Sequence, residues 1–169
     1  MVGVREGVTI QGMIRTQAVL NDLLDRTEDL SPLMAQIGAY GEESSVHRFE
    51  EQKGPDGKPW EKSLRAKATG GQTLVDSGRY RSSITWNADR DSAEWGTNLI
   101  YASVHQDGAT IRAKGGGRLG FFIPGIGFRS PVEVVIPSRP VFGISDEDET
   151  GIDAIIHDYI AEAIPGAIP

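Results

Sequence analysis

The chain has 169 residues, a formal net charge of −7, 38% hydrophobic residues and no cysteine. This length and composition indicate a single globular domain that can bury a core. The lack of cysteine excludes disulfides, thiolate zinc sites and cysteine nucleophiles. The acidic balance argues against specific nucleic-acid binding, because contact with a phosphate backbone depends on clustered Lys and Arg. The sequence has no signal-peptide pattern and no apolar run near the roughly 20 residues that span a bilayer, so we expect a cytoplasmic protein without a membrane segment.

The N-terminal part, residues 11–52, is expected to be helical. Before it, residues 2–10 alternate between apolar and polar types, which indicates a half-buried strand. Residues 13–26 carry leucines at helical spacing and predict the first helix. Ser31 is followed by a proline and is typical of an N-cap, so the second helix should run from there to about Glu51.

One face of the second helix is marked by residues that recur every three or four positions. They are Leu33, Ile37, Tyr40 and Ser44. Gly38 and Gly41 interrupt this helix and would weaken it by up to roughly 1 kcal/mol each. An alternative is that the two glycines mark a close crossing with another helix.

A turn segment separates these helices from the rest of the chain. Residues 54–59 contain two prolines and two glycines and cannot be helical. Trp60 follows, and we expect it to anchor the turn on the core. Residues 74–83 then predict a turn and a short helix with Asp76 or Ser77 as its cap.

Residues 74–144 should form the sheet. The predicted strands are residues 84–87, 93–97, 110–113 and 132–136. A polar turn joins the first two and predicts a hairpin. Between the second and third strands, turn formers bound the apolar stretch 97–108, which predicts a short helical turn over residues 101–106. The fold class is therefore α+β, a mainly antiparallel sheet of four to five strands packed with the N-terminal and C-terminal helices.

Residues 114–131 are expected to form a long glycine-rich hairpin arm between two of the strands. This segment holds six glycines, two prolines and three phenylalanines. A loop of this length inside a domain is usually functional or disordered, and its aromatic residues argue against disorder. We expect the arm to reach a neighbouring molecule rather than its own core.

The last helix is predicted over residues 146–164. Ser145 and Asp148 fit a capping box with Asp in place of the usual Glu. The residues that step along one face at helical spacing are Ile152, Ile155, Ile156, Tyr159, Ile160 and Ala163. We expect this stripe to be buried against the sheet.

Four short motifs occur along the middle of the chain. They are GPDG-PW at residues 54–60, L-DSGR-SI at 74–84, GTN-YA-HQ-G at 96–108 and IP-RP-FG-S at 136–145. In this order they resemble the phage virion morphogenesis family, the tail completion or tail terminator proteins of Mu-like and related contractile-tailed phages. The resemblance runs from about Gly54 to Ser145. The flanking segments agree with the family only in being helical, and they carry none of these motifs.

The resemblance implies a structural protein of a bacteriophage or prophage, with no enzymatic activity and no cofactor. Proteins of this family cap the tail tube at its head-proximal end and make the head–tail joint in the virion. The implied partners are further copies of the chain in a ring, the tail tube, and neck or head-completion proteins. Tail tubes of these phages are sixfold, so a hexamer is expected. A head-side neck connector is the alternative.

The residues expected to contact other subunits or partners lie in the turn segment, the central stretch, the arm and the segment after the last strand. They are Trp60, Arg79, Tyr101, His105, Gln106, Phe121, Phe122, Ile123, Ile126, Phe128 and Arg139. The arm is expected to be one patch and the exposed side of residues 54–67 its receiver. Arg139 stands between stiffening prolines and suits a bidentate carboxylate contact. That contact is either an internal salt bridge that orients the last helix or a bond to another subunit.

No catalytic, metal or cofactor site is predicted. The three histidines lack the four-residue spacing of zinc-binding helices, and we expect His105 to fix its turn through a hydrogen bond. An alternative is a small hydrolase in which His105 acts with Ser77 or Asp76. The acidic run 146–149 is explained by a helix N-terminus, and the glycines at 115–117 by a hinge.

Overall fold

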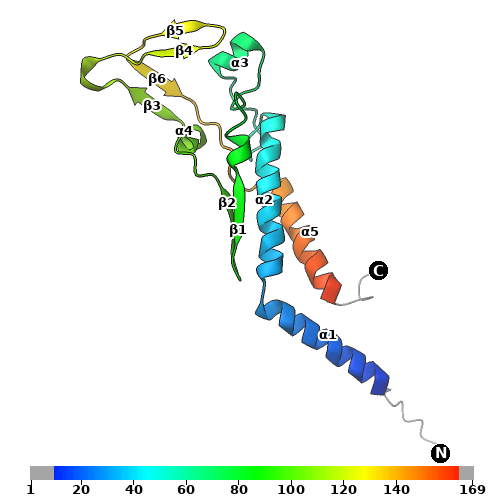
Figure 1. The fold of residues 1–169 in the computed structure, drawn as a ribbon. Coiled ribbons are helices and arrows are strands. Elements are labelled where there is room, and N and C mark those ends of the chain that lie inside the picture. Colours follow the sequence, from blue (N-terminus) through cyan, green and yellow to red (C-terminus); the bar gives the residue numbers. More distant parts are fainter. Residues whose placement is uncertain (1–9, 164–169) are drawn as a thin grey trace, which may run out of the picture.

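The computed structural model describes residues 10–163. Its elements are α1 (Ile10–Glu28), α2 (Ser31–Glu51), α3 (Leu64–Thr69), η1 (Arg81–Ser83), β1 (Thr85–Ala88), β2 (Ala93–Gly96), α4 (Ala102–Asp107), β3 (Ala109–Arg112), η2 (Lys114–Gly116), β4 (Phe121–Ile123), β5 (Gly127–Arg129), β6 (Glu133–Ile136) and α5 (Asp146–Ala163). Figure 1 shows an elongated molecule with α5 and the β1–β2 hairpin on opposite sides of α2. The other strands lie at one end, and α1 extends away at the other. The α+β class and the antiparallel pairing are confirmed.

The six strands form three two-stranded ribbons, β1–β2, β3–β6 and β4–β5. The expected single sheet of four to five strands is therefore wrong. Each strand has only three or four residues, and Pro131 and Pro137 flank β6, where they supply no backbone donor for a wider sheet. The β4–β5 hairpin is the tip of the predicted arm. It continues the β3–β6 ribbon through the bonds Ala113 N to Val132 O (3.0 Å) and Leu119 N to Pro131 O (2.7 Å).

Both predicted N-terminal helices are confirmed as α1 and α2. The strand predicted over residues 2–10 lies outside the described residues except for Ile10, where it is wrong because α1 begins there. Ser31 is not the N-cap of α2. Leu30 occupies that position without a side-chain bond, and the Asp29 carboxylate accepts from the Ser31 N–H at 2.9 Å.

The segment between α3 and β1 is less regular than predicted. It holds one 3-10 turn, η1, in place of a short helix capped by Asp76 or Ser77. The Ser77 hydroxyl instead accepts from the Arg79 N–H at 3.3 Å, in the turn that precedes η1. A hydroxyl that satisfies a nearby turn in this way competes with helix formation.

Gly38 and Gly41 allow the β1–β2 hairpin to approach α2 closely. A Cβ added at Gly38 would lie 2.8 Å from Trp86 Cε3, and one at Gly41 would lie 2.3 Å from Trp95 Cδ2. Trp86 and Trp95 are cross-strand partners. The two glycines therefore mark the contact of α2 with a hairpin, and the alternative of a crossing with another helix is wrong for them.

We expect Gly41→Ala to destabilise the protein by about 1–3 kcal/mol, because the added methyl group overpacks the contact with Trp95. In an exposed helix the same change would stabilise by up to about 1 kcal/mol, so the sign of the effect is diagnostic. Urea unfolding provides the measurement. Gly96→Ala is the control, since a Cβ there meets no atom within 4 Å. A more stable Gly41→Ala protein would contradict the packing of the hairpin on α2.

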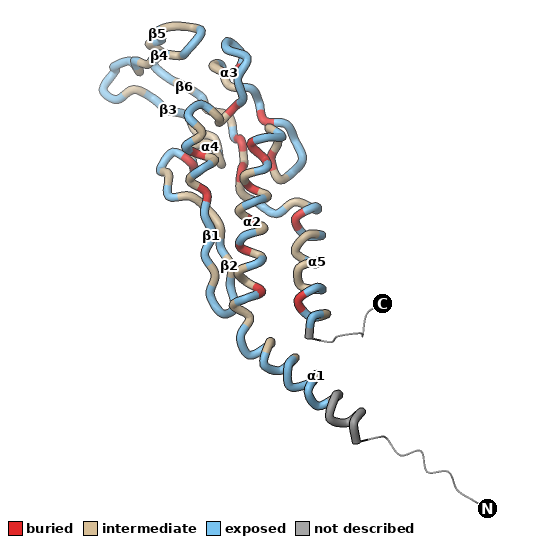
Figure 2. Tube along the Cα trace, turned by 45° about the vertical axis from the view of Figure 1, so that its right-hand side comes forward, coloured by how far each residue is buried: buried red, intermediate tan, exposed pale blue. Residues whose placement is uncertain are grey.

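Figure 2 shows buried positions along α2, near α4 and on α5. The cluster of buried hydrophobic side chains joins α2, the residues beside η1, α4 and the chain after β6. The core consists of Phe49, Trp60, Tyr80, Ile84, Ala102 and Val141. The Phe49 ring meets Trp60 and Tyr80 edge-on, with centroid distances of 5.5 and 5.2 Å, a favourable arrangement for aromatic pairs. Trp60 thus anchors the turn segment, as predicted, and its Nε1 donates to Pro140 O at 3.0 Å.

The last helix, α5, packs on α2 and α1, so the prediction that it packs on a sheet is wrong. The β1–β2 hairpin occupies the opposite side of α2. Among the stripe residues whose burial is described, Tyr159 is buried, Ile152, Ile155 and Ile156 are half-buried, and Ile160 is exposed. Two helices that contact α5 along one side leave this stripe partly open to solvent.

Candidate assembly surfaces

Two of the predicted contact residues serve their own subunit. Trp60 belongs to the core, and the Gln106 side chain joins α4 to the chain after β6. The Gln106 side-chain oxygen accepts from the N–H groups of Val141 (2.9 Å) and Phe142 (3.0 Å), and its amide donates to Phe142 O at 2.7 Å. Because these bonds satisfy three backbone groups, Gln106 fixes the position of α4.

Four other predicted residues line one cavity of about 390 Å³: Arg79, Tyr101, His105 and Arg139. They come from three separate parts of the sequence, with Tyr101 and His105 both at α4, and the packing of α4 on the core brings them together. Tyr80 forms part of the same wall. Its ring lies 5.8 Å from that of Tyr101 and 6.2 Å from that of His105, measured between centroids.

Arg139 is buried, at 5% exposure. Its Nε donates to Glu61 O at 2.7 Å and its Nη1 to Pro137 O at 3.5 Å, both backbone carbonyls. Burial lowers the pKa of Arg139 below its ordinary value, although the nearby Glu61 carboxylate acts in the opposite direction. No carboxylate within the described residues forms a salt bridge with it, so the alternative of an internal salt bridge is wrong and the contact with another subunit stays a prediction.

His105 does not hold its turn by the hydrogen bond we expected. Its Nδ1 is buried without a partner in the described part of the chain, and its backbone carbonyl accepts from the Arg139 N–H at 2.6 Å. Burial, reinforced by the charge of Arg139, lowers the pKa of His105. The imidazole is therefore neutral at pH 7.

Asp76 and Ser77, the partners of His105 in the hydrolase alternative, line the same cavity. The Ser77 hydroxyl accepts from a backbone N–H, and Asp76 Oδ1 lies 3.6 Å from Arg65 Nε. Neither residue forms a hydrogen bond with His105 in the described structure. A hydrolase of this kind needs a nucleophile hydrogen-bonded to its base, and a third group that orients the base. The described structure does not bring Ser77, Asp76 and His105 into that arrangement.

The arm presents an apolar face to solvent. Phe122 and Phe128 are cross-strand partners with exposures of 69% and 66%. The other predicted contact residues of the arm, Phe121, Ile123 and Ile126, are half-buried. The turn of the hairpin rests on α3 of the same subunit, where a Cβ added at Gly125 would lie 3.0 Å from Ala68 Cβ. The exposed phenylalanine pair is therefore the part of the arm that is free to contact another molecule.

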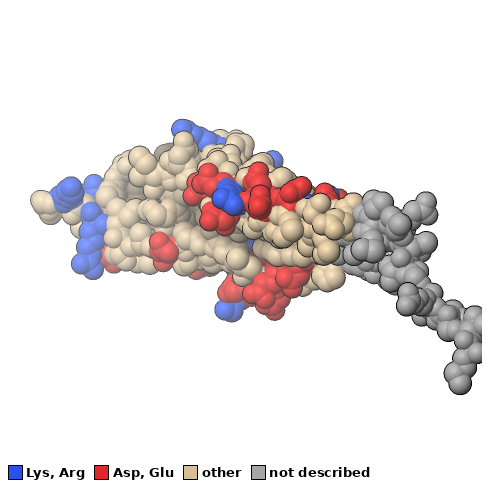
Figure 3. Space-filling model, turned by 90° about the horizontal axis from the view of Figure 1, so that it is seen from below, with Lys and Arg blue, Asp and Glu red and all other residues tan. Residues whose placement is uncertain are grey.

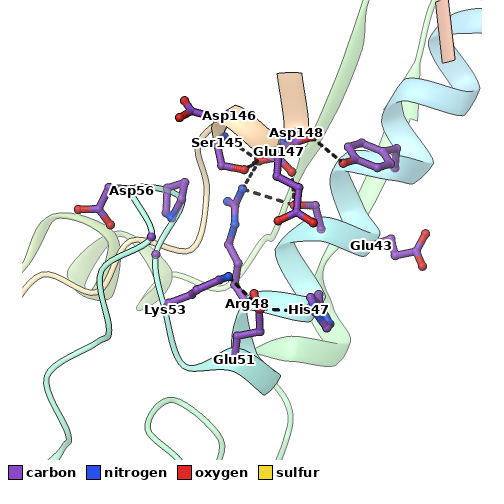
Figure 4. Close-up of a pocket in the computed structure, with 15 residues that line it drawn as sticks. Glu43, His47, Arg48, Glu51, Lys53, Asp56, Ser145, Asp146, Glu147 and Asp148 are labelled. Carbon is purple, nitrogen blue, oxygen red and sulfur yellow. Dashed lines mark hydrogen bonds and ion pairs between the residues drawn. The ribbon is translucent and has the colours of Figure 1, made fainter. Parts of the chain in front are cut away.

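A groove of about 580 Å³ lies between the C-terminal half of α2, residues 53–57 and the start of α5 (Figure 4). At its base Arg48 forms an ion pair with Asp148, and the two side chains are 5% and 7% exposed. Asp148 also completes the predicted capping box. It accepts from the Ser145 N–H at 2.7 Å, while its own N–H donates to the Ser145 hydroxyl at 3.1 Å.

Several groups compete to set the pKa of Asp148. Burial alone would raise it, but hydrogen bonds from Ser44 and Ser145 and the charge of Arg48 outweigh burial and hold the pKa below its ordinary value. Asp148 is thus a buried carboxylate that stays ionised near neutral pH. It is the residue that orients α5 on α2, the role that the sequence had suggested for Arg139.

The groove and the arm carry opposite charge. Around the buried ion pair, the groove is lined by five further carboxylates and one lysine, Glu43, Glu51, Asp56, Asp146, Glu147 and Lys53. The basic side chains of the arm, all exposed, are Lys114, Arg118 and Arg129. Figure 3 shows basic side chains at the left end, where Figure 1 places the arm, and acidic ones gathered nearer the middle.

Arg48 was missed in the sequence, although a pattern in α2 could have indicated it. The face through Leu33, Ile37, Tyr40 and Ser44 continues to Arg48 by one more step of four residues. A charged residue on a face that is otherwise apolar or small requires a buried counter-ion. The capping carboxylate at the start of the last helix was a candidate for that role.

Within residues 10–163, no group of three or more His, Cys, Asp or Glu side chains is arranged to hold a metal ion. None of the described helices is both long and apolar enough to cross a membrane.

Comparison with known proteins identifies the family. The model of the phage virion morphogenesis family matches residues 13–161, and the chain belongs to this family. It is 31% identical over 142 residues to the Mu-like prophage FluMu G protein 2 of Haemophilus influenzae, an alignment that covers 84% of this chain and 86% of the relative. No solved structure matches the chain. The protein is therefore a phage morphogenesis protein.

Proposed function

We propose that this protein completes the phage tail at its head-proximal end and forms the joint to the head. The observation that carries the proposal is membership of the phage virion morphogenesis family over nearly the whole chain. The exposed arm supports it, because two solvent-facing phenylalanines paired across a hairpin are typical of a contact surface. The role requires assembly and no chemistry, and the protein is not proposed to be an enzyme.

The proposed assembly is a closed ring, with six copies to match a sixfold tail tube. A ring requires a heterologous interface between two different patches of each subunit. The arm is one patch, and the acidic groove between α2 and α5 is the other. Residues 53–57 form a wall of this groove, so the receiver expected at 54–67 coincides with it in part. The subunit's own arm instead contacts Ala68 and Thr69, directly after that segment.

The proposed partners besides further copies are the tail tube on one side and neck or head-completion proteins on the other. A net charge of −7 per chain suits a ring through which DNA passes, because few contacts with phosphate groups can form. The same charge gives mutual repulsion between copies, so the free protein should associate more readily as salt is added.

The head-side neck connector remains the second candidate, and electron microscopy of a phage that lacks the gene separates the two. Loss of a tail-completing protein should leave full heads unattached to tails, and tails of abnormal length or with open ends. Normal tails beside heads that lose their DNA would identify a neck connector. The phage complemented with His105→Gln should assemble normally, whereas a loss of assembly in this variant would favour a role for the histidine in chemistry.

A further inference from the structure

The cavity beside α4 is lined by hydrogen-bond donors that are not paired with a carboxylate. Arg139 lies at its base and donates only to neutral backbone carbonyls. A buried guanidinium is normally paired with a carboxylate. The side chain of Glu61, whose carbonyl Arg139 contacts, pairs instead with Lys67 at 3.6 Å. Arg139 therefore has no carboxylate within ion-pair distance in the described structure, and Glu61 acts on its charge only at longer range.

Tyr80 supplies a second such donor. The residue is 4% exposed and its hydroxyl has no hydrogen-bond partner among the described residues. A buried hydroxyl without a hydrogen-bond partner destabilises the folded protein. Burial raises the pKa of Tyr80 to about 12, so the hydroxyl keeps its proton and is available to donate at neutral pH.

Arg79 stands exposed on the rim of the same cavity and forms no ion pair within the described part of the chain. The nearest acidic residue of the wall, Asp76, is already paired with Arg65. Arg79, Arg139 and Tyr80 thus line a space of about 390 Å³ in which the single carboxylate of the described wall, Asp76, is paired with Arg65.

We propose that this cavity binds a carboxylate carried by a neighbouring protein chain. Arg139 contacts the carboxylate from below, Arg79 closes over it from the rim, and the Tyr80 hydroxyl donates a further bond. Planar guanidinium groups match the two oxygens of a carboxylate, and such charge-assisted bonds are about twice as strong as neutral ones. An acidic side chain of a second copy is the expected source, and only this identity of the neighbour rests on the proposed function.

Acetate serves as the probe in the first experiment. The Nε–H resonances of Arg79 and Arg139 in ¹⁵N-labelled protein are followed during titration with sodium acetate, with sodium chloride holding the ionic strength constant. We expect saturable shifts of both resonances, and binding at least about tenfold weaker for Arg79→Gln, a loss of about 1.4 kcal/mol. Arg81→Gln is the matched control, because Arg81 faces Glu50 at 3.7 Å and does not line the cavity. This variant should bind acetate as the unmodified protein does.

Tyr80→Phe separates binding from folding. The change removes an unsatisfied hydroxyl, so thermal stability without acetate should be unchanged or higher, while acetate affinity falls. Equal acetate affinity in the unmodified protein, Arg79→Gln and Tyr80→Phe would overturn the proposal and indicate a cavity filled by water.

Two further measurements identify the source of the carboxylate. Weaker self-association of Arg79→Gln in sedimentation would identify a second copy, and weaker binding only to tails assembled without the protein would identify another virion protein. If both stay unchanged, no neighbour uses the cavity and the proposal fails. The acetate titration uses isolated protein, so its result does not depend on whether the tail-completion role holds.

Discussion

Asp148→Asn should lower the free energy of unfolding by about 3–5 kcal/mol, because it leaves Arg48 buried without a counter-ion. The change also weakens the capping box of α5, since Asp148 accepts from both the N–H and the hydroxyl of Ser145. Urea unfolding followed by circular dichroism gives the measurement. Asp146→Asn is the matched control, as Asp146 is exposed in the same helical turn and its loss costs only the dipole contribution of about 0.3–1 kcal/mol.

The pH dependence gives a second readout of the same ion pair. The pKa of Asp148 is depressed in the folded protein, so its stabilisation is fully present above the unfolded pKa of about 3.9 and is lost as pH falls through the lower folded pKa. The unmodified protein should therefore lose stability below about pH 4 more steeply than Asp148→Asn. Equal acid sensitivity and a loss below 1 kcal/mol at neutral pH would show that the pair does not hold α5.

Deletion of residues 116–130, with a tight turn in their place, should leave a folded monomer that no longer assembles. The core lies at the junction of α2, η1 and α4 and contains no arm residue, so the loss of stability should be small. Two phenylalanines buried on a partner contribute roughly 1.5–3 kcal/mol each, and their loss should weaken association at least about tenfold. Sedimentation velocity across protein and salt concentrations measures the association, and thermal melting measures the fold.

A double substitution tests the arm without changing its length. Phe122→Ser with Phe128→Ser should reproduce the assembly defect, and the pair Phe122→Leu with Phe128→Leu, which keeps an apolar face, should largely restore assembly. An arm deletion that unfolds the monomer, or that assembles as the unmodified protein does, would show that the arm belongs to the subunit core or has no role in assembly.

The helices and the arm could be predicted because local patterns determine them. Ser145 and Asp148 specify a helix start within four residues. The prolines and glycines at 54–59 exclude a helix there, whatever the fold of the rest of the chain. The single sheet was predicted wrongly because strand pairing depends on distant contacts. The β1–β2 hairpin packs on α2 at two glycines of that helix. No local pattern in the sequence of the two strands predicts this contact.

Several residues of the cavity beside α4 were singled out in the sequence, but Tyr80 was not, and the contacts among them were not predicted. Arg79, His105 and Arg139 were each selected separately, but only the packing of α4 places them around one cavity. The internal salt bridge considered for Arg139 is formed by Arg48, for which the sequence had suggested no role. Both arginines are buried, and the difference lies in which carboxylate the fold brings within reach, since Asp148 meets Arg48 across 100 positions of sequence.

The most direct test of the tail-completion proposal is a cryo-EM reconstruction of the head-proximal end of tails assembled with this protein. The account predicts a closed ring of six copies, with the β4–β5 hairpin of each copy against the α2–α5 groove of the next. A stable twofold dimer in solution, together with a tail end that carries no copy of the protein, would contradict it.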